Sequence, residues 1–103
     1  MSRVDALKAM LAQDPNNTFV RYGLAMEYKN SGSLELAVEE FNGLLTVNPA
    51  YSAAYFHGGQ ALEGLGRLED ARSMYESGIE ATTKNGDAHT RSELQGALDL
   101  LPI

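Results

Sequence analysis

The side chains that most often carry out chemistry are sparse in this sequence. There are two histidines, His57 and His89, and neither stands at a recurrent metal-binding spacing from carboxylates or within a His-Glu-x-x-His string. Asp87 stands two residues before His89, but an acidic residue at such a place is more typical of a helix N-cap. Cysteine is absent, which excludes disulfides, thiolate metal sites and cysteine nucleophiles. These residues predict neither catalysis nor metal binding.

Two further patterns resemble ligand-binding motifs and are better explained by structure. Gly58-Gly59 has no preceding strand and lacks the Gly-Lys-Ser/Thr ending of a phosphate loop, so it predicts close packing of a helix. The acidic pairs lack EF-hand spacing and are typical of solvated helix faces. These pairs are Glu39-Glu40, Glu69-Asp70 and Glu76 with Glu80. The sequence therefore predicts a protein that is not an enzyme and that uses no cofactor and no metal.

Composition limits the class of protein. A chain of 103 residues with 44% apolar and 21% charged residues is typical of one soluble globular domain. Its formal charge of −6 repels nucleic acid phosphates and anionic lipids, so we expect no nucleic acid and no membrane partner. We find no long apolar run and no secretion signal, and the default location is cytoplasmic.

Regularly spaced turn residues divide the chain into helix-length segments whose apolar residues recur at steps of three and four. No segment alternates with period two, so the predicted fold is all-α. We expect six helices, at about residues 2–13, 18–30, 34–47, 52–65, 68–83 and 87–100. Ser2 with Asp5 and Ser33 are the expected caps of the first and third helices.

An internal repeat is the clearest signal. The motif Gly-x-Leu-Glu-x-Ala begins at Gly32 and again at Gly66, which is 34 residues later. The same offset relates Pro15 to Pro49, Tyr22 to Phe56, Tyr28 to Leu62 and Phe41 to Tyr75. Proline ends a helix, so each of the two prolines marks a boundary between successive helix pairs.

With this period the chain resembles the tetratricopeptide repeat (TPR) family, in its small bacterial form, whose unit is a helix–turn–helix of 34 residues. The family pattern is matched by Leu24, Ala25, Tyr28, Ala37, Phe41 and Pro49, then by Tyr55, Gly59, Leu62, Ala71 and Tyr75. Departures stand at Arg21, Gly58 and Thr83, where the family has a large aromatic, Leu and Pro.

The resemblance implies antiparallel helix–turn–helix repeats stacked as a short right-handed α-solenoid. It divides a single domain, 1–103, into an N-terminal half-repeat helix (1–17), two repeats (18–51 and 52–85) and a C-terminal capping helix (86–103). Glycines inside the expected helices predict modest stability, because each costs about 0.5–1 kcal/mol relative to Ala. They are Gly23, Gly43, Gly58, Gly78 and Gly96.

The family's groove positions indicate a binding surface. In the family, the first helix of each pair lines a concave groove through its second, fifth, ninth and twelfth repeat positions. Carried over, the peptide-binding candidates are Phe19, Tyr22, Met26, Lys29, Phe56 and Gln60, with Ala53 and Glu63 at the remaining positions. The alternative is that this aromatic stripe packs in the core. Lys29, with Arg21 near it, is expected to meet an acidic group of the ligand.

The resemblance implies a protein-interaction module that binds another protein, as a peptide or helix, in a partly aromatic groove. The Lys and Asn clamp with which some members grip acidic chaperone tails is missing, so we do not expect that ligand. The alternative function is self-association, for example as a homodimer, or a spacer or scaffold role in a larger assembly without a dedicated peptide ligand.

Overall fold

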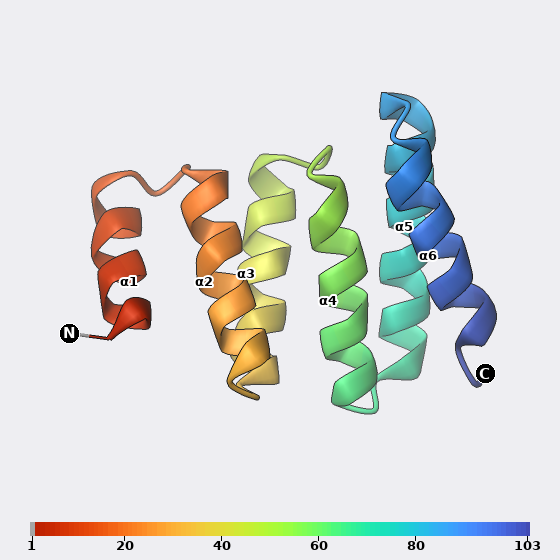
Figure 1. The fold of residues 1–103 in the computed structure, drawn as a ribbon, viewed down its shortest axis with the longest axis horizontal. Helices are drawn as coiled ribbons and strands as arrows, with labels where there is room; N and C mark the ends of the chain where they lie inside the picture. The colour runs from red at the N-terminus through yellow and green to blue at the C-terminus, as the bar shows by residue number, and fades with distance from the viewer. Residues whose placement is uncertain (1) are drawn as a thin grey trace.

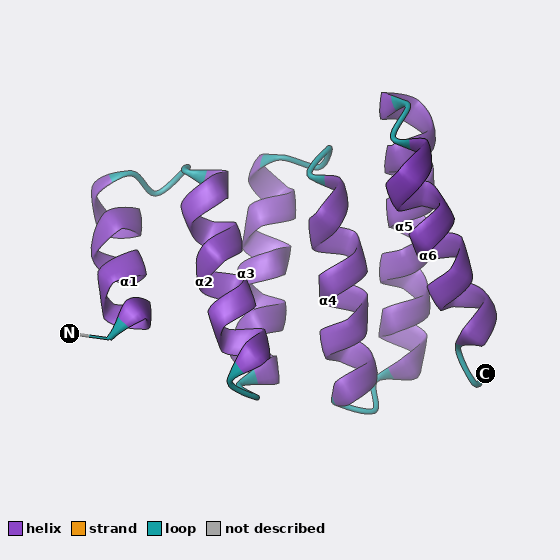
Figure 2. Cartoon of the chain, viewed as in Figure 1, coloured by secondary structure: helices purple, strands orange, loops and turns teal. Residues whose placement is uncertain are grey.

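The computed structural model describes residues 2–103 and consists there of six α-helices joined by short loops, without strands (Figures 1 and 2). The helices are α1 (Arg3–Gln13), α2 (Thr18–Asn30), α3 (Leu34–Val47), α4 (Ser52–Gly64), α5 (Leu68–Asn85) and α6 (Ala88–Leu100). The predicted all-α fold is confirmed. Met1, with which the predicted unit 1–17 begins, lies outside the described residues. None of these six helices is both long and apolar enough to cross a bilayer.

The helices stack in two layers along the longest dimension of the molecule, with the two ends of the chain at opposite ends of the stack (Figure 1). Helices α2, α4 and α6 face the viewer in Figure 1, and α3 and α5 lie behind them. In the first layer the backbone of α4 approaches those of α2 and α6 to within 8 Å between Cα atoms, whereas within residues 2–103 the backbones of α3 and α5 stay farther apart than that. This difference in spacing indicates that the stack curves toward α2, α4 and α6, and we refer to the side that these three helices form as the concave side.

Short polar residues are the N-caps of the first three helices. Ser2 and Asp5 form the predicted capping box of α1, with the Ser2 hydroxyl accepting from the Asp5 amide at 3.1 Å. Asn17 caps α2 through its side chain. Ser33 is the N-cap residue of α3 as predicted, but its side chain makes no capping hydrogen bond.

Two predicted boundaries shift because of the turn chemistry. Helix α5 runs to Asn85 and does not stop at residue 83, since the first residue after its start at Leu68 that takes a left-handed conformation is Gly86, at φ 77°. Helix α4 ends one residue before the predicted end, at Gly64. Gly66 follows with φ 74°, which suits glycine because it has no Cβ.

The core repeats at the same 34-residue offset as the sequence. Ala37 and Ala71 are fully buried, and so are Phe41 and Tyr75. A Cβ added at Gly59 would overlap the ring of Tyr75, so a glycine here lets the aromatic side chain lie directly on the α4 backbone. The small residues of the motif are therefore the surfaces on which the large ones pack.

Glycines inside the helices have different surroundings. At Gly78 an added Cβ would lie 2.6 Å from Tyr55 Cβ and 2.9 Å from Leu94 Cδ1. At Gly58 it would lie 3.3 Å from Met74 Cε, which agrees with the packing role predicted for Gly58-Gly59. At Gly96 no atom of another described residue would lie within 4 Å of such a Cβ, apart from the neighbouring helix backbone. The helix-propensity cost of glycine is thus offset by close packing at Gly58 and Gly78, and is uncompensated at Gly96.

The first helix is the least anchored part of the stack. No residue of α1 is fully buried, and α1 contacts α2 but no other helix of the described chain. Leu7 packs at the edge of the core, and an ion pair of 2.6 Å joins Arg3 to Glu27 of α2.

Candidate functional site

The residues predicted to bind a peptide lie on α2 and α4, the first two helices of the concave layer. Phe19, in the first turn of α2, is 78% exposed. Tyr22 and Met26 on α2, and Phe56 on α4, are half-buried and pack against the edge of the core. Gln60 is also half-buried. Phe19 is therefore the most exposed of this set, whereas Tyr22, Met26 and Phe56 also serve the fold.

Aromatic rings form a continuous cluster behind this face. The cluster consists of Tyr22, Phe41, Tyr51, Phe56 and His57. The centroid of the Tyr22 ring lies 5.1 Å from the centroid of the Tyr51 ring. It lies 6.2 Å from the centroid of the buried Phe41 ring, which it meets edge-on. Phe56 and His57 meet edge-on at 5.3 Å. Such edge-on pairs hold rings in fixed orientations, so the wall of this face is largely preformed.

Lys29 joins α2 to α4 through the groove face. Its Nζ donates to Gln60 Oε1 at 2.6 Å and lies 2.9 Å from His57 Nδ1. An ammonium group can only donate, so Nδ1 of His57 accepts and is unprotonated in this contact. Both partners are neutral, and within residues 2–103 no ion pair includes Lys29. Burial lowers the pKa of Lys29, as expected for a half-buried cation without a counter-ion.

His57 is held in its neutral form. Burial lowers the pKa of His57, and the Lys29 ammonium lowers it further. A hydrogen bond with Gln60 and the negative charge of Glu93 on α6 act in the opposite direction and do not cancel the effect. The imidazole is therefore a neutral acceptor that fixes Lys29.

We expect acidification to destabilise the protein through His57. The unfolded histidine takes up a proton near pH 6.5, whereas the folded one resists protonation until lower pH, so the unfolded state binds more protons in between. The free energy of unfolding should therefore fall as the pH is lowered from above 6.5 toward 5. Thermal melts of wild-type protein and His57→Gln, followed by circular dichroism, test this, because Gln retains an acceptor for Lys29 but does not titrate. Identical pH dependence of the two melting temperatures would contradict it.

Arg21 does not share the groove with Lys29, so that part of the sequence interpretation is wrong. Its guanidinium lies over Gly43 of α3, pairs with Glu40 at 3.6 Å and donates to the Pro15 carbonyl at 3.2 Å. The family's aromatic position is thus occupied by a cation that pairs within the fold. Of the predicted groove positions, Lys29 is therefore the one with a basic side chain.

Sequence reasoning missed His57 and the contribution of α6. His57 was considered only as a metal ligand, although it follows the groove residue Phe56 directly in sequence. Helix α6 was expected only to cover the end of the stack. The 34-residue offset applied to Glu63 reaches Ala97, which would have indicated a third helix on the groove side.

A hollow of about 350 Å³ lies between α4 and α6 on the concave side, and we refer to it as the α4–α6 pocket. It is lined by Phe56, Gln60, Glu63, Glu93, Ala97 and Leu100, with Tyr75 at its base. Its lining thus combines groove residues predicted from the sequence with residues of α6. The concave face has a shaped recess at this end.

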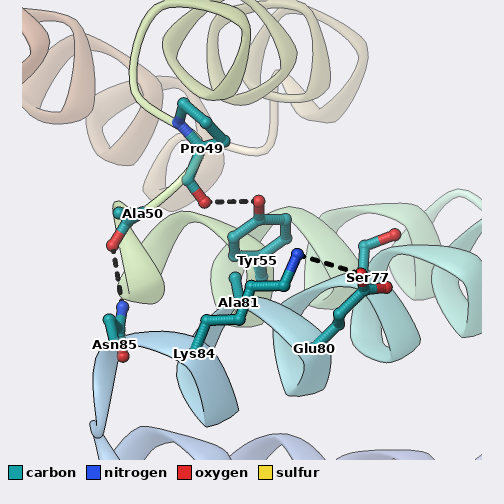
Figure 3. A pocket seen from close by; sticks show the side chains of 8 residues that line it. All are labelled: Pro49, Ala50, Tyr55, Ser77, Glu80, Ala81, Lys84 and Asn85. Carbon is teal, nitrogen blue, oxygen red and sulfur yellow. Dashed lines mark hydrogen bonds and ion pairs between the residues drawn. The ribbon is translucent and has the colours of Figure 1, made fainter.

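A second hollow, of about 450 Å³, lies where the loop between α3 and α4 meets the end of α5 (Figure 3). Two hydrogen bonds cross it. The Tyr55 hydroxyl donates to the Pro49 carbonyl at 2.6 Å, and Asn85 Nδ2 donates to the Ala50 carbonyl at 3.3 Å (Figure 3). These bonds tie the loop to α4 and α5, so we interpret this hollow as part of the scaffold.

Asp87 and His89, which the sequence also offered as candidates for chemistry, belong to helix α6 and its N-cap. Asp87 caps α6 as predicted, accepting from the Thr90 amide at 3.0 Å, and this hydrogen bond lowers the pKa of Asp87. The His89 ring is exposed, 3.7 Å from Glu93. Residues 2–103 contain no group of three His, Cys, Asp or Glu residues that could hold a metal ion.

Comparisons with known proteins agree on one family. A family model described as tetratricopeptide repeat matches residues 20–51 and 52–85. A TPR repeat-containing protein of Pseudomonas aeruginosa is 31% identical over 91 residues, which are 88% of this chain and 87% of that protein.

Solved structures of similar fold include two at more than 25% identity. A solution structure of a Bordetella parapertussis protein has a TM-score of 0.84 at 33% identity, covering 98% of this chain and 88% of that one. The first TPR of Spaghetti, solved bound to the HSP90 peptide SRMEEVD, has a TM-score of 0.73 at 26% identity. That match covers 93% of this chain and 77% of that one.

Proposed function

Because the chain belongs to the tetratricopeptide repeat family, we propose that it is a protein-interaction module whose concave face binds a peptide or helix of another protein. The proposed contact residues are Phe19, Tyr22, Met26, Lys29, Phe56 and Gln60. The observation that carries this proposal is the composition of the concave face, where the exposed Phe19 precedes Tyr22 of the aromatic cluster by three residues on α2 and so lies on the same side of that helix. Exposed aromatic side chains recur at recognition sites because they bury large areas at low entropic cost.

Lys29 supplies the proposed polar anchor. Its ammonium is half-buried and hydrogen-bonded to the neutral side chains of His57 and Gln60. A ligand carboxylate beside it would provide the missing counter-ion in a partly desolvated place, where a charge-assisted hydrogen bond is stronger than at an open surface. The peptide complex of the Spaghetti TPR supports peptide binding by this fold. We propose no catalytic role.

We expect the double variant Phe19→Ala, Phe56→Ala to weaken peptide binding at least about tenfold, because an aromatic anchor commonly contributes more than about 1.4 kcal/mol. The probe is a peptide selected from a random-peptide display library on the immobilised wild-type chain, and its affinity is measured by isothermal titration calorimetry. The matched control is Leu36→Ala, Val47→Ala, which truncates two exposed apolar side chains of α3, in the other layer. Circular dichroism verifies that both variants are folded.

Two results would contradict the proposal. Unchanged affinity in the Phe19→Ala, Phe56→Ala protein would exclude the concave face as the binding site. Failure to select any peptide, together with concentration-dependent sedimentation of the wild-type chain, would favour the alternative of self-association or a scaffold role. A monomer at high concentration would count against that alternative.

A further inference from the structure

We propose that the α4–α6 pocket binds a basic side chain of the ligand, a Lys or Arg residue of the bound peptide. The inference rests on the proposed function, because it names the chemistry of one ligand residue within the same groove. The pocket adjoins the predicted groove residues Phe56 and Gln60, so a peptide that follows the concave face reaches it.

Glu63 gives the pocket a positioned carboxylate. The hydroxyl of Tyr75, whose side chain is fully buried, donates to Glu63 Oε2 and leaves Oε1 for a ligand. Burial raises the pKa of Tyr75, and the hydrogen bond with Glu63 raises it further, so the phenol remains a donor at neutral pH. The Glu63 carboxylate is thereby oriented from the core before any ligand arrives.

Glu93 supplies a second carboxylate from the opposite wall. Its side chain is 47% exposed, and the His89 ring, which can form an ion pair with it only when protonated, lies 3.7 Å away with a side chain that is 88% exposed. A contact between two such exposed side chains is weak, so a basic side chain of a ligand can replace His89 beside Glu93. Two acidic groups on facing helices can both approach one ammonium or guanidinium group, and Arg in particular presents several donors in a fixed plane.

The remaining walls suit the aliphatic part of a basic side chain. Phe56 of α4 and Ala97 and Leu100 of α6 provide apolar surface, and Leu100 is 85% exposed in the free protein. Lys and Arg bury their methylene stems on such surface while the charged head reaches polar groups. A volume of about 350 Å³ is at the low end for ligand sites, which fits one side chain better than an entire small molecule.

Other classes of occupant fit less well. A divalent metal prefers several oxygen ligands, and within residues 2–103 no third acidic or histidine side chain joins Glu63 and Glu93 in a metal-binding group. An anion would meet two carboxylates, and no Lys or Arg of the described chain lines the pocket. The overall charge of −6 adds to the attraction for a cation.

Lys29 gives the groove two ends of opposite charge. Its ammonium is hydrogen-bonded to Gln60 on the side of the pocket that faces α2, while Glu63 and Glu93 stand toward α6. A peptide with an acidic residue near Lys29 and a basic residue in the pocket would therefore be bound in one direction. Opposite alignment would place like charges together, which disfavours it.

The experiment starts from the peptides selected on the wild-type chain. In the strongest binder, each basic residue is replaced in turn by norleucine, which keeps the aliphatic stem and removes the charge. We expect one such replacement to lower affinity about tenfold on wild-type protein, measured by isothermal titration calorimetry, and to have little effect on Glu63→Gln, Glu93→Gln. Non-additivity in this cycle identifies a direct pair. The control protein Glu35→Gln, Glu69→Gln loses the same charge from exposed sites on α3 and α5 and should behave as wild type.

Each contrary outcome has a distinct meaning. Selected peptides without enriched Lys or Arg, or a norleucine peptide that binds as well as its parent, would overturn the cation pocket. The proposed function would still stand if the Phe19→Ala, Phe56→Ala protein lost affinity for those peptides. An equal effect in the Glu35→Gln, Glu69→Gln control would also overturn the pocket, because it would assign the effect to overall charge. Peptides insensitive to Phe19→Ala, Phe56→Ala would instead reject the groove itself.

Discussion

Phe41→Ala is expected to reduce the free energy of unfolding by about 3–5 kcal/mol, the usual cost of emptying a buried phenylalanine site. Phe41 is fully buried on α3, and its ring contacts those of Tyr22 and His57. Gly58 of α4 faces this site, since a Cβ added there would lie 3.5 Å from Phe41 Cβ, and glycine has no side chain with which to fill the cavity left behind. The same ring supports both the core and the groove wall.

Urea denaturation followed by circular dichroism measures this loss, and the expected fall in melting temperature is at least ~12 °C for a domain of this size. Phe19→Ala is the matched control, since it removes the same side chain from a site that is 78% exposed. That variant should remain within about 0.5 kcal/mol of wild type. If Phe41→Ala lowered the free energy of unfolding by less than about 1 kcal/mol, neighbouring side chains would have to fill the site, and the prediction would be wrong.

Gly59→Ala and Gly96→Ala are expected to change stability in opposite directions. At Gly59 the new methyl group would overlap the buried Tyr75 ring, which is flanked by packed helices, so we expect a loss of about 1–3 kcal/mol from overpacking. At Gly96 the methyl group meets nothing within 4 Å, and replacing glycine in a helix interior should stabilise by about 0.5–1 kcal/mol. Chemical denaturation of both variants measures the two changes.

The two substitutions are chemically identical, so each is the control for the other. A stabilising Gly59→Ala would mean that Tyr75 can move away from α4, and the hydrogen bond between Tyr75 and Glu63 should then weaken as well. A destabilising Gly96→Ala would imply that α6 contacts something at that face in solution.

The helices could be predicted because their signals are local. Bounds of α2 and α3 agree with the sequence prediction residue for residue, since Pro15, Gly32 and Pro49 interrupt the chain at fixed offsets. The end of α5 was placed two residues early, because Thr83 holds the position of a family proline and a helix continues until a residue able to stop it, here Gly86. The ends of a helix can thus be predicted where the sequence has a proline or glycine that interrupts it.

The site was less accessible to such reasoning because it depends on which side chains meet across helices. The repeat offset brought Tyr22 and Phe56 to one face, but it could not show that Arg21 would pair with Glu40 on α3. It also could not show that Lys29 and His57, 28 residues apart, would be joined by a contact of 2.9 Å. Periodicity encodes the orientation of each helix, whereas pairing of long polar side chains follows from the packed assembly.

The weak anchoring of α1 has a consequence for how the molecule opens. A stack in which each helix contacts mainly its neighbours loses its order from the ends, because an end unit has one interface to break and an inner unit has two. Among residues 2–103, helix α1 contacts α2 alone and buries no residue completely. Thermal fluctuations will therefore detach α1 more often than they separate α2 from α3, and each detachment uncovers the flank of α2 that α1 covers while leaving the surface between α4 and α6 intact.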